Sequence, residues 1–334
     1  MRIAIVILNW NGQKLLEQFL PSVVNFSSQE ADIYLADNAS TDSSINYVRA
    51  FFPSIKIVEN AINGGYAKGY NDALKSIDAD IYCLLNSDIE VTKNWLKPII
   101  EVFKVDEKVA IIQPKILDFK DKTKFEYAGA GGGFIDLYGY PYCRGRVFNH
   151  LETDKGQFND VKDIFWASGA CLFIRSQVYH TLKGFDEDYF AHQEEIDLCW
   201  RLKNKGFKVM VEPKSVVYHV GGGTLNAGSP FKTYLNFRNN LFMLFKNLPT
   251  SYLFTTIPMR LVLDGVAALT FLNKEKGLEH VLAIAKAHFS FYFAIPNLIA
   301  KRQKISQKNS LVGKMNWSIL VKNKMNGIKQ FSEL

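Results

Sequence analysis

Short apolar runs alternate with amphipathic stretches over the first hundred residues of the chain. The run 3–8 is continuous and rich in Ile and Val, which is typical of a strand buried on both faces of a sheet. An amphipathic stretch from about residue 13 predicts a helix after it. Further strands are predicted at 32–36, 55–58 and 81–85, and further helices after 42–44 and over 68–76. Strands that alternate with helices predict an α/β fold whose parallel sheet is covered on both faces.

The pattern changes twice along the rest of the chain. From about residue 110 it loosens into Gly- and aromatic-rich sequence, followed by strand-like runs at 170–174, 208–213 and 215–224 and a helical stretch at 194–205. After residue 233 long helical stretches rich in Phe, Leu and Lys take over. We therefore expect a domain boundary near residue 235, between an α/β body and a helical C-terminal region.

Polar residues follow three of the predicted strands at the point where each strand ends. These are Asn9-Trp10-Asn11, Asp37, and Asn86-Ser87-Asp88. Ligands of open α/β sheets bind at the carboxyl ends of the strands, so these side chains are predicted to line one site. Asn, Ser and Asp are also common turn formers, and each segment taken alone fits a turn as well.

Two segments carry residues suited to a metal ion. Asp88, with Asn86 and Ser87 before it, offers hard oxygen ligands that suit Mg²⁺ or Mn²⁺ held jointly with a diphosphate. His219 ends the apolar run 216–218 and precedes three glycines. It is either a hydrogen-bonded structural residue or the ligand that completes a metal site begun by Asp88.

The glycines of 63-NGGYAKGYNDAL-74 stand where backbone would approach a ligand closely. The segment has no Gly-Lys-Ser/Thr, so it is not a P-loop, and its glycine spacing differs from the dinucleotide-binding fingerprint. A Rossmann-type dehydrogenase is disfavoured for the same reason. A loop that folds over a nucleotide sugar and a plain helix start both fit this stretch.

Three carboxylates crowd the start of the helix predicted at 194–205, namely Glu194, Glu195 and Asp197. Acidic side chains in a first turn are stabilised by the helix dipole by roughly 0.3–1 kcal/mol each. Asp197 and Arg201 are also spaced for a helical ion pair, so a purely structural helix start is one interpretation. Crowded carboxylates repel one another, however, and this repulsion raises the proton affinity of at least one of them, which suits a general base.

Charge is distributed unevenly along the chain. Residues 235–334 carry 14 Lys or Arg and 4 Asp or Glu, whereas the chain as a whole has a net charge of +7. The apolar stretches 251–272 and 287–300 are interrupted by charges or proline, and we expect neither to reach the roughly 18–20 apolar residues of a membrane span. They are predicted either to pack on the body or to lie on an anionic membrane surface. Nucleic acid is disfavoured because the basic tail contains no recognisable binding module.

The cysteines and the start of the chain bear on its location. Cys83, Cys143, Cys171 and Cys199 are scattered without metal-ligand spacing, which indicates reduced thiols. The first apolar run is too short for a signal peptide and is interrupted by Asn9. A cytoplasmic protein is expected, either free or peripheral on the inner face of the cytoplasmic membrane.

Seven motifs in order resemble family 2 glycosyltransferases, most of all the bacterial rhamnosyltransferase-type and galactofuranosyltransferase-like enzymes. They are ILNWNG, DNASTDSS, NGGYAKGYN, LLNSD, FWASGACLFIR, GFDEDYFAHQEEIDLCWRL and VVYHVGGG, within about residues 1–245. The resemblance implies a GT-A fold over 1–234, with a Rossmann-like nucleotide-sugar half (1–110) and an acceptor half (111–234). Residues 235–334 would then be a helical C-terminal extension.

The same resemblance implies an inverting, metal-dependent transfer of rhamnose or another hexose or deoxyhexose. The donor would be a dTDP-, UDP- or GDP-linked sugar, and the acceptor a glycan or lipid-linked glycan of bacterial surface polysaccharide. Carried over by motif, the residues that would bind the donor are Asn9, Trp10, Asn11, Asp37, Gly65, Tyr66, Asn71, Asn86 and Ser87. The residues on the acceptor side would be Trp166, Ser168 and Gly169, and the ligands of Mg or Mn would be Asp88 and His219. The catalytic helix start would consist of Glu195, Glu194 and Asp197.

Within that helix start, Glu195 is the preferred base, Glu194 is its alternate, and Asp197 is the structural partner of Arg201. Two positions depart from the family pattern, since Asn86 replaces the first Asp of the D-x-D motif and Glu195 stands where the family has Asp. These departures leave open the alternative of a non-catalytic nucleotide-sugar-binding or membrane scaffold protein of the same fold. The oligomeric state is open as well, because an apolar helical region could serve a dimer.

Overall fold

The computed structural model describes residues 1–221, 228–273, 275–305 and 313–334. Its strands are β1 (Ile3–Asn9), β2 (Asp32–Asp37), β3 (Lys56–Glu59), β4 (Ile81–Asn86), β5 (Ile89–Val91), β6 (Val109–Asp118), β7 (Gly133–Ile135), β8 (Pro141–Cys143), β9 (Arg146–Val147), β10 (His150–Leu151), β11 (Lys162–Asp163), β12 (Cys171–Arg175) and β13 (Lys208–His219). Its helices are α1 (Gln13–Ser27), α2 (Ser44–Phe51), α3 (Gly65–Ala73), η1 (Leu74–Ser76), α4 (Leu96–Val105), α5 (Ser176–Thr181), η2 (Glu187–Tyr189), α6 (Glu194–Asn204), α7 (Pro230–Asn247), α8 (Thr250–Phe271), α9 (Gly277–Lys304), α10 (Ile319–Lys324) and η3 (Phe331–Glu333).

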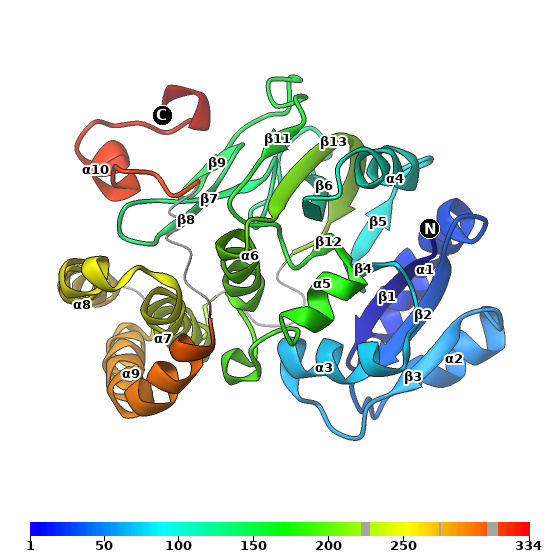
Figure 1. Ribbon diagram of the computed structural model, residues 1–334, viewed down its shortest axis with the longest axis horizontal. Coiled ribbons are helices and arrows are strands. Elements are labelled where there is room, and N and C mark those ends of the chain that lie inside the picture. The colour runs from blue at the N-terminus through cyan, green and yellow to red at the C-terminus, as the bar shows by residue number, and fades with distance from the viewer. Residues whose placement is uncertain (222–227, 274, 306–312) are drawn as a thin grey trace.

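A large mixed sheet forms the centre of the molecule (Figure 1). In the described residues it has nine strands in the order β11-β13-β6-β12-β4-β1-β2-β3, with β5 paired to β13. The predicted β–α alternation of the first hundred residues is confirmed, since β1 pairs in parallel with β2 and β4, and β2 with β3. A smaller antiparallel sheet, β10-β9-β8-β7, is built from the Gly- and aromatic-rich segment.

The second half of the sheet, for which the sequence predicted no strand directions, is mixed. Strand β12 pairs antiparallel with both β4 and β6, while β13 runs parallel to β6. A parallel neighbour needs a crossover connection, usually a helix, whereas β12 is reached from β6 through the small sheet and so is free to enter in either direction. The two runs predicted at 208–213 and 215–224 contribute to one strand, β13, which ends at His219 and whose register shifts between Glu212 and Val216. Residues 222–224 of the second run lie outside the described residues.

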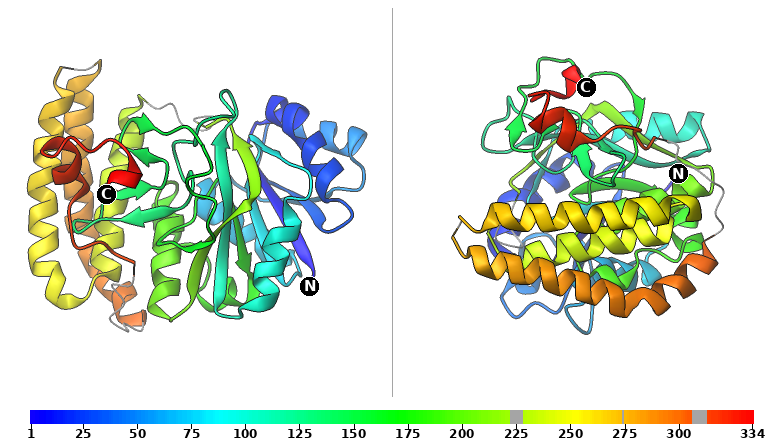
Figure 2. Two further views of the ribbon diagram at one scale, coloured as in Figure 1. Left: turned by 90° about the horizontal axis from the view of Figure 1, so that it is seen from above. Right: turned by 90° about the vertical axis from the view of Figure 1, so that its left-hand side faces the viewer.

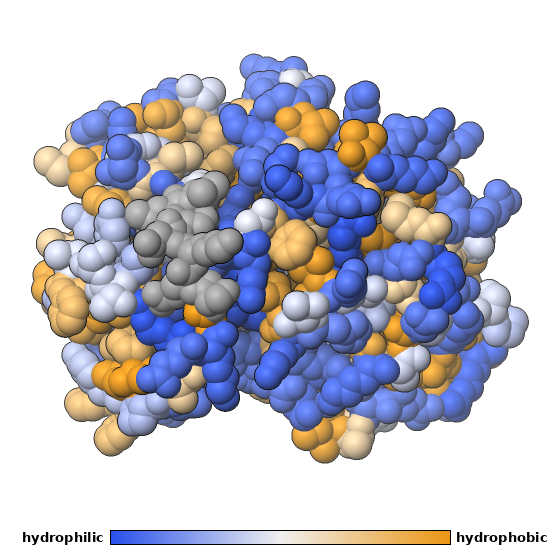
Figure 3. All heavy atoms as spheres, viewed as in Figure 1, coloured by the Kyte–Doolittle hydropathy of each residue, from blue (hydrophilic) through white to orange (hydrophobic). Residues whose placement is uncertain are grey.

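Helices α7, α8 and α9 form an outer layer at one end of the molecule (Figure 2). The boundary predicted near residue 235 lies inside α7, which begins at Pro230. The only charged residues of α8, Arg260 and Asp264, pair with each other at 3.1 Å and are 3 % and 0 % exposed. Hydrophobic side chains are left outside and gather along the left-hand edge in Figure 3, over α8 and α9.

Helices α8 and α9 contain the two apolar stretches that were expected to be too short for a membrane span. Within the described parts of the chain, both are long and apolar enough to cross a membrane by length and composition. This corrects the expectation that neither would reach the length of a span, because α8 continues through Arg260 and Asp264 for 22 residues and α9 continues through Pro296 for 28 residues.

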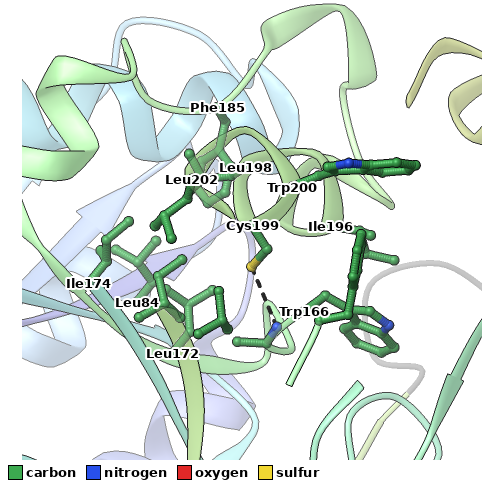
Figure 4. Packing of buried hydrophobic residues seen from close by; sticks show 14 of the residues in the cluster. Leu84, Trp166, Leu172, Ile174, Phe185, Ile196, Leu198, Cys199, Trp200 and Leu202 are labelled. Carbon is green, nitrogen blue, oxygen red and sulfur yellow. Dashed lines mark hydrogen bonds between the residues drawn. The ribbon is translucent and has the colours of Figure 1, made fainter. Parts of the chain in front are cut away.

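Alternate residues of the central strands supply two cores, one on each face of the sheet. One face packs against α1, α2 and α4, and the other against α3, α5 and α6. Figure 4 shows Leu198 and Leu202 of α6 on the side that faces Leu84, Leu172 and Ile174 of the sheet. Because this face of α6 is buried against β4 and β12, the first turn of α6 is held at the end of the sheet where the polar residues gather.

Candidate active site

Two strands bring Asp88 and His219 together. Asp88 precedes β5, His219 ends β13, and the antiparallel pairing of these strands sets His219 opposite Ile89. The His219 Nε2 atom lies 3.2 Å from the Asp88 Oδ1 atom, and both side chains are buried. The structure therefore unites the two residues predicted to bind a metal ion, and their role as ligands stays a prediction.

Glu126, which no sequence pattern singled out, lies on the other side of the His219 ring. Its Oε1 atom is 3.3 Å from His219 Nδ1, and its side chain is buried. Burial alone would lower the pKa of His219, but the pairing with Asp88 and Glu126 outweighs it and raises this pKa to about 10. Within the described residues, no three His, Cys, Asp or Glu side chains form a metal site by themselves. A cation here would therefore draw further ligands from a bound molecule.

The residues that follow β1 and β2 are linked by hydrogen bonds. Asn9 Nδ2 donates to Asp37 Oδ1 at 3.0 Å, and Asp37 Oδ2 accepts from the Ser40 backbone N–H at 2.8 Å. The Asn11 Oδ1 atom accepts from the Thr41 backbone N–H at 2.7 Å. Asp37 is 1 % exposed, so in this structure it organises the loop after β2. A contact with a nucleobase would require it to exchange one of these partners.

An open rim lies beside this loop. The Trp10 side chain is 50 % exposed, as a residue that stacks on a ligand would be. A cavity of about 300 Å³ adjoins the loop and is lined by Asn11, Gly12, Gln13, Lys14, Leu15 and Asp42. The cavity and the exposed ring therefore lie at the predicted donor side of the sheet.

The glycine segment forms a helix start that packs on protein. Gly65 begins α3 with φ +75°, and a Cβ atom there would lie 2.5 Å from the Phe190 carbonyl oxygen. The Tyr66 backbone N–H donates to that same oxygen at 2.8 Å, and the Tyr66 hydroxyl donates to the Gly169 carbonyl at 2.7 Å. Asn71 Nδ2 donates to the Phe185 carbonyl at 2.9 Å. The segment therefore forms a helix start, and its predicted role as a loop over a nucleotide sugar stays a prediction.

The predicted acceptor segment is mostly internal. Trp166 is 4 % exposed and its Nε1–H donates to the Phe134 carbonyl at 2.8 Å. Ser168 is also buried, and its hydroxyl donates to the Ala128 carbonyl. Gly169 keeps partial exposure, so it is the member of the three that can border a bound acceptor. Trp166 and Ser168 shape the wall behind it.

Glu194 and Glu195 form the first turn of α6. Each has its Oε2 atom buried with no hydrogen-bond partner among the described residues. Burial raises the pKa of Glu195 to about 7, although part of this side chain stays exposed. Burial and then the charge of Glu195 raise the pKa of Glu194 well above its usual value. A carboxyl group that titrates near neutrality is suited to take up a proton during catalysis.

The glutamate pair lies close to the start of α3. Burial raises the pKa of Tyr66 well above its usual value, and the nearby charges of Glu194 and Glu195 raise it further. Because the Tyr66 hydroxyl also bonds to Gly169, the structure unites three predicted sets: a donor-side residue, an acceptor-side residue and the candidate bases.

Asp197 has a structural role. Its Oδ2 atom accepts from Arg201 Nε at 2.8 Å, so the predicted ion pair is confirmed. Its Oδ1 atom accepts from Asn247 Nδ2 at 2.8 Å and lies 2.9 Å from Lys246 Nζ. Burial opposes ionisation, but Lys246 and Arg201 lower the pKa of this fully buried carboxyl. Asp197 therefore ties α6 to α7 and presents no open face to a substrate.

Comparison with known proteins gives this site its context. The model of the family described as Glycosyl transferase family 2 matches residues 4–182, more than half of the chain. The chain belongs to this family. The matched region includes β1, β4 and Asp88, and it ends before α6. The protein is therefore a glycosyltransferase, and its mixed sheet with C-terminal helices is a GT-A fold.

Three similar proteins illustrate the family. The chain is 23 % identical over 231 residues to the N-acetylglucosaminyl-diphospho-decaprenol L-rhamnosyltransferase of Mycobacterium tuberculosis, covering 64 % of this chain and 75 % of the relative. It is 21 % identical over 316 residues to the low-salt glycan biosynthesis hexosyltransferase Agl10 of Haloferax volcanii, covering 88 % and 96 %. Its fold matches that of the mannosyltransferase PcManGT from Pyrobaculum calidifontis, in complex with GDP-Man and Mn²⁺, with a TM-score of 0.53 at 15 % identity, over 98 % of this chain and 88 % of that one.

Proposed function

We propose that this glycosyltransferase moves rhamnose or another hexose or deoxyhexose from a nucleoside-diphosphate donor to a glycan or lipid-linked glycan of surface polysaccharide. The observation that carries the proposal is the pair Glu194 and Glu195, whose buried oxygens lack partners among the described residues, beside Tyr66 and Gly169. The decaprenol-linked substrate named for the mycobacterial relative supports a lipid-linked acceptor, and the GDP-Man of the archaeal structure supports a nucleotide-sugar donor.

Asp88 and His219 fit a divalent cation, Mg²⁺ or Mn²⁺, which would displace the proton that His219 holds at its raised pKa. A carboxylate oxygen and an imidazole nitrogen lie side by side, and the second ring nitrogen faces Glu126. Such a carboxylate behind a metal-binding histidine sets its tautomer and ring orientation. A bound cation would offset the charge that develops on the leaving diphosphate. Since Asn86 replaces the first Asp of the family motif, diphosphate oxygens would supply the remaining ligands.

In the proposed reaction, Glu195 takes the proton of the acceptor hydroxyl, and Glu194 is its alternate. The acceptor oxygen attacks the anomeric carbon as the bond from that carbon to the diphosphate breaks, and the nucleoside diphosphate leaves. Attack from the face opposite the leaving group inverts the configuration, through a transition state that resembles an oxocarbenium ion. The raised pKa of Glu195, about 7, matches a base that works near neutral pH.

A thermal-shift panel tests the proposal. dTDP-rhamnose, UDP-galactofuranose, UDP-glucose, UDP-galactose and GDP-mannose are each added with and without Mn²⁺. A ligand at a hundred times its Kd stabilises the folded state by about 2.7 kcal/mol, so one donor should raise the melting temperature when Mn²⁺ is present. If no donor shifts it with metal present, the protein is not the proposed transferase, and the alternative of a membrane scaffold protein gains.

The outer face of α8 and α9 is proposed to lie on an anionic membrane surface, where a lipid-linked acceptor would be met. On α8 this face includes Phe254, Val262 and Leu269, and on α9 Phe289 and Phe293, all more than 60 % exposed. Arg260 and Asp264, the charged residues of α8, point into the protein. A helix whose outer face meets water carries its charged residues on that outer face, so α8 has the opposite arrangement. The basic C-terminal region supplies charge complementary to anionic lipid.

Vesicle co-sedimentation should detect this contact. Phe254→Ser combined with Phe293→Ser should weaken binding to anionic vesicles by at least about tenfold, because burying one Phe side chain contributes about 1.5–3 kcal/mol. Val105→Ser on α4, also strongly exposed, is the control and should bind as the wild type does. Binding that ignores both the double substitution and the anionic lipid content would contradict the proposal. A dimer that the double substitution dissociates would assign this face to a second copy of the chain.

A further inference from the structure

The loop that leads into α6 follows a strained path. Phe190 has φ 62° and ψ −60°, and the Ala191 backbone N–H donates to the Tyr189 carbonyl at 2.7 Å, which defines a γ-turn of the rare, strained hand. His192 and Gln193 then both have φ 71°. Such positions in non-glycine residues cost about 1–3 kcal/mol each and persist only where the surroundings hold them. Since Glu194 follows at once, the direction of the glutamate pair depends on this path.

Helix α7 supplies the groups that hold the loop. The Asn239 Nδ2 atom lies 3.1, 2.9 and 2.8 Å from the carbonyl oxygens of Tyr189, Ala191 and His192. Asn239 is 0 % exposed, so bulk water does not compete for the bonds of its amide. Arg238 Nε donates to Asn239 Oδ1 at 2.9 Å and so turns the N–H groups of this amide toward the carbonyls.

Further hydrogen bonds, on either side of those made by Asn239, also hold this loop. The Phe190 carbonyl accepts from the Tyr66 backbone N–H at 2.8 Å, at the start of α3. The Gln193 side chain bonds to α7 at both ends, accepting from Asn240 Nδ2 at 3.0 Å and donating to the Asn236 carbonyl at 3.1 Å. The loop is therefore fixed between a helix of the predicted donor half and a helix beyond the matched family region.

We propose that Asn239 is a positioning residue for the glutamate pair. Its buried amide holds three carbonyls of a turn that would otherwise relax, and through that turn it sets where Glu194 and Glu195 point. Asn239 acts through the backbone, so it is not a base or a ligand. The inference rests on the proposed function, because it takes one of these glutamates as the acceptor of the hydroxyl proton.

Asn239→Ala tests the proposal, and Leu235→Ala is the control. The control opens a cavity at a buried position of the same helix and removes no hydrogen-bond donor to the loop. Misplacing a catalytic group by about 1 Å can cost about 10²-fold in rate. Asn239→Ala should therefore lower kcat by about 10²-fold with the donor KM nearly unchanged, whereas Leu235→Ala should keep most of kcat at temperatures where it is folded.

A second readout separates positioning from simple loss of stability. A relaxed loop would let water reach the glutamate carboxylate and lower its pKa, so the acid limb of the kcat/KM profile should move to lower pH in Asn239→Ala only. If that variant does not fold, Arg238→Gln removes the group that orients the amide from a partly exposed position, and should show a smaller loss with the same pattern.

Two results would overturn the inference. One is wild-type kcat in Asn239→Ala, and the other is an equal loss in Asn239→Ala and Leu235→Ala with the acid limb unmoved. Failure of the proposed function looks different, since the wild type would then transfer no sugar from any donor. If the wild type is active, Glu195→Gln is inactive and Asn239→Ala is fully active, only the positioning role of Asn239 is contradicted.

Discussion

Glu195→Gln is expected to bind the nucleotide-sugar donor as the wild type does and to lose transfer by at least about 10²-fold. Proton uptake by a positioned base contributes about 10²–10⁴-fold, and glutamine keeps the shape of glutamate without the basic oxygen. The measurement is kcat for transfer, with donor binding followed by thermal shift. Near-normal turnover together with an inactive Glu194→Gln would move the base to Glu194. If both variants stay active, the catalytic scheme is wrong.

The raised pKa of Glu195 gives this prediction a pH dependence. A base must be deprotonated, so kcat/KM of the wild type should fall about tenfold per pH unit below its pKa of about 7. The stability of the folded protein should change with pH in the opposite direction from the activity. Because the folded pKa is raised above the unfolded one, the protonated form is favoured in the fold, and stability is lost as pH rises through about 7. Glu195→Gln should therefore melt higher than the wild type at pH 8 but not at pH 4.

Asp88→Asn is expected to abolish the Mn²⁺-dependent part of donor binding and to lower transfer by at least about 10²-fold. The substitution removes the carboxylate charge beside His219 while preserving side-chain size. A cation that stabilises a leaving diphosphate contributes several kcal/mol, and each 1.4 kcal/mol is tenfold. The thermal shift of each variant is measured with donor, at increasing Mn²⁺. An undiminished Mn²⁺-dependent shift in Asp88→Asn would remove Asp88 from the metal site.

Glu126→Gln provides a graded comparison at the same site. Glu126 lies against the Nδ1 side of His219, away from Asp88, so it would be an outer partner of a bound cation, and such partners change metal affinity by about 10–100-fold. This variant should therefore need more Mn²⁺ and then recover full activity at saturation, which Asp88→Asn should not do. Equal and irreversible losses in both variants would indicate that Glu126 supports the fold here and does not tune His219.

Prediction from the sequence succeeded where the signal is local. The apolar run at 3–8 and the amphipathic stretch from residue 13 became β1 and α1, because burial imposes a period that neighbouring residues reveal. It gave no direction for β12, since a buried run looks the same in either orientation. The outward apolar face of α8 was also hidden, because composition does not tell which side of a helix meets the protein.

The sequence by itself determined the family, the elements of the donor half and the crowding of carboxylates at the start of α6, because motif order and periodicity are read along the chain. Only the tertiary structure decided which carboxylates are available for chemistry. Asp197 is paired with Lys246 and accepts a hydrogen bond from Asn247, 50 residues away, whereas burial raises the pKa of both Glu194 and the partly exposed Glu195. Glu126 and Asn239 likewise reach the site through packing. Charge and hydrogen-bond partners distant in sequence set a carboxyl pKa, and no local pattern encodes which partners the fold will bring.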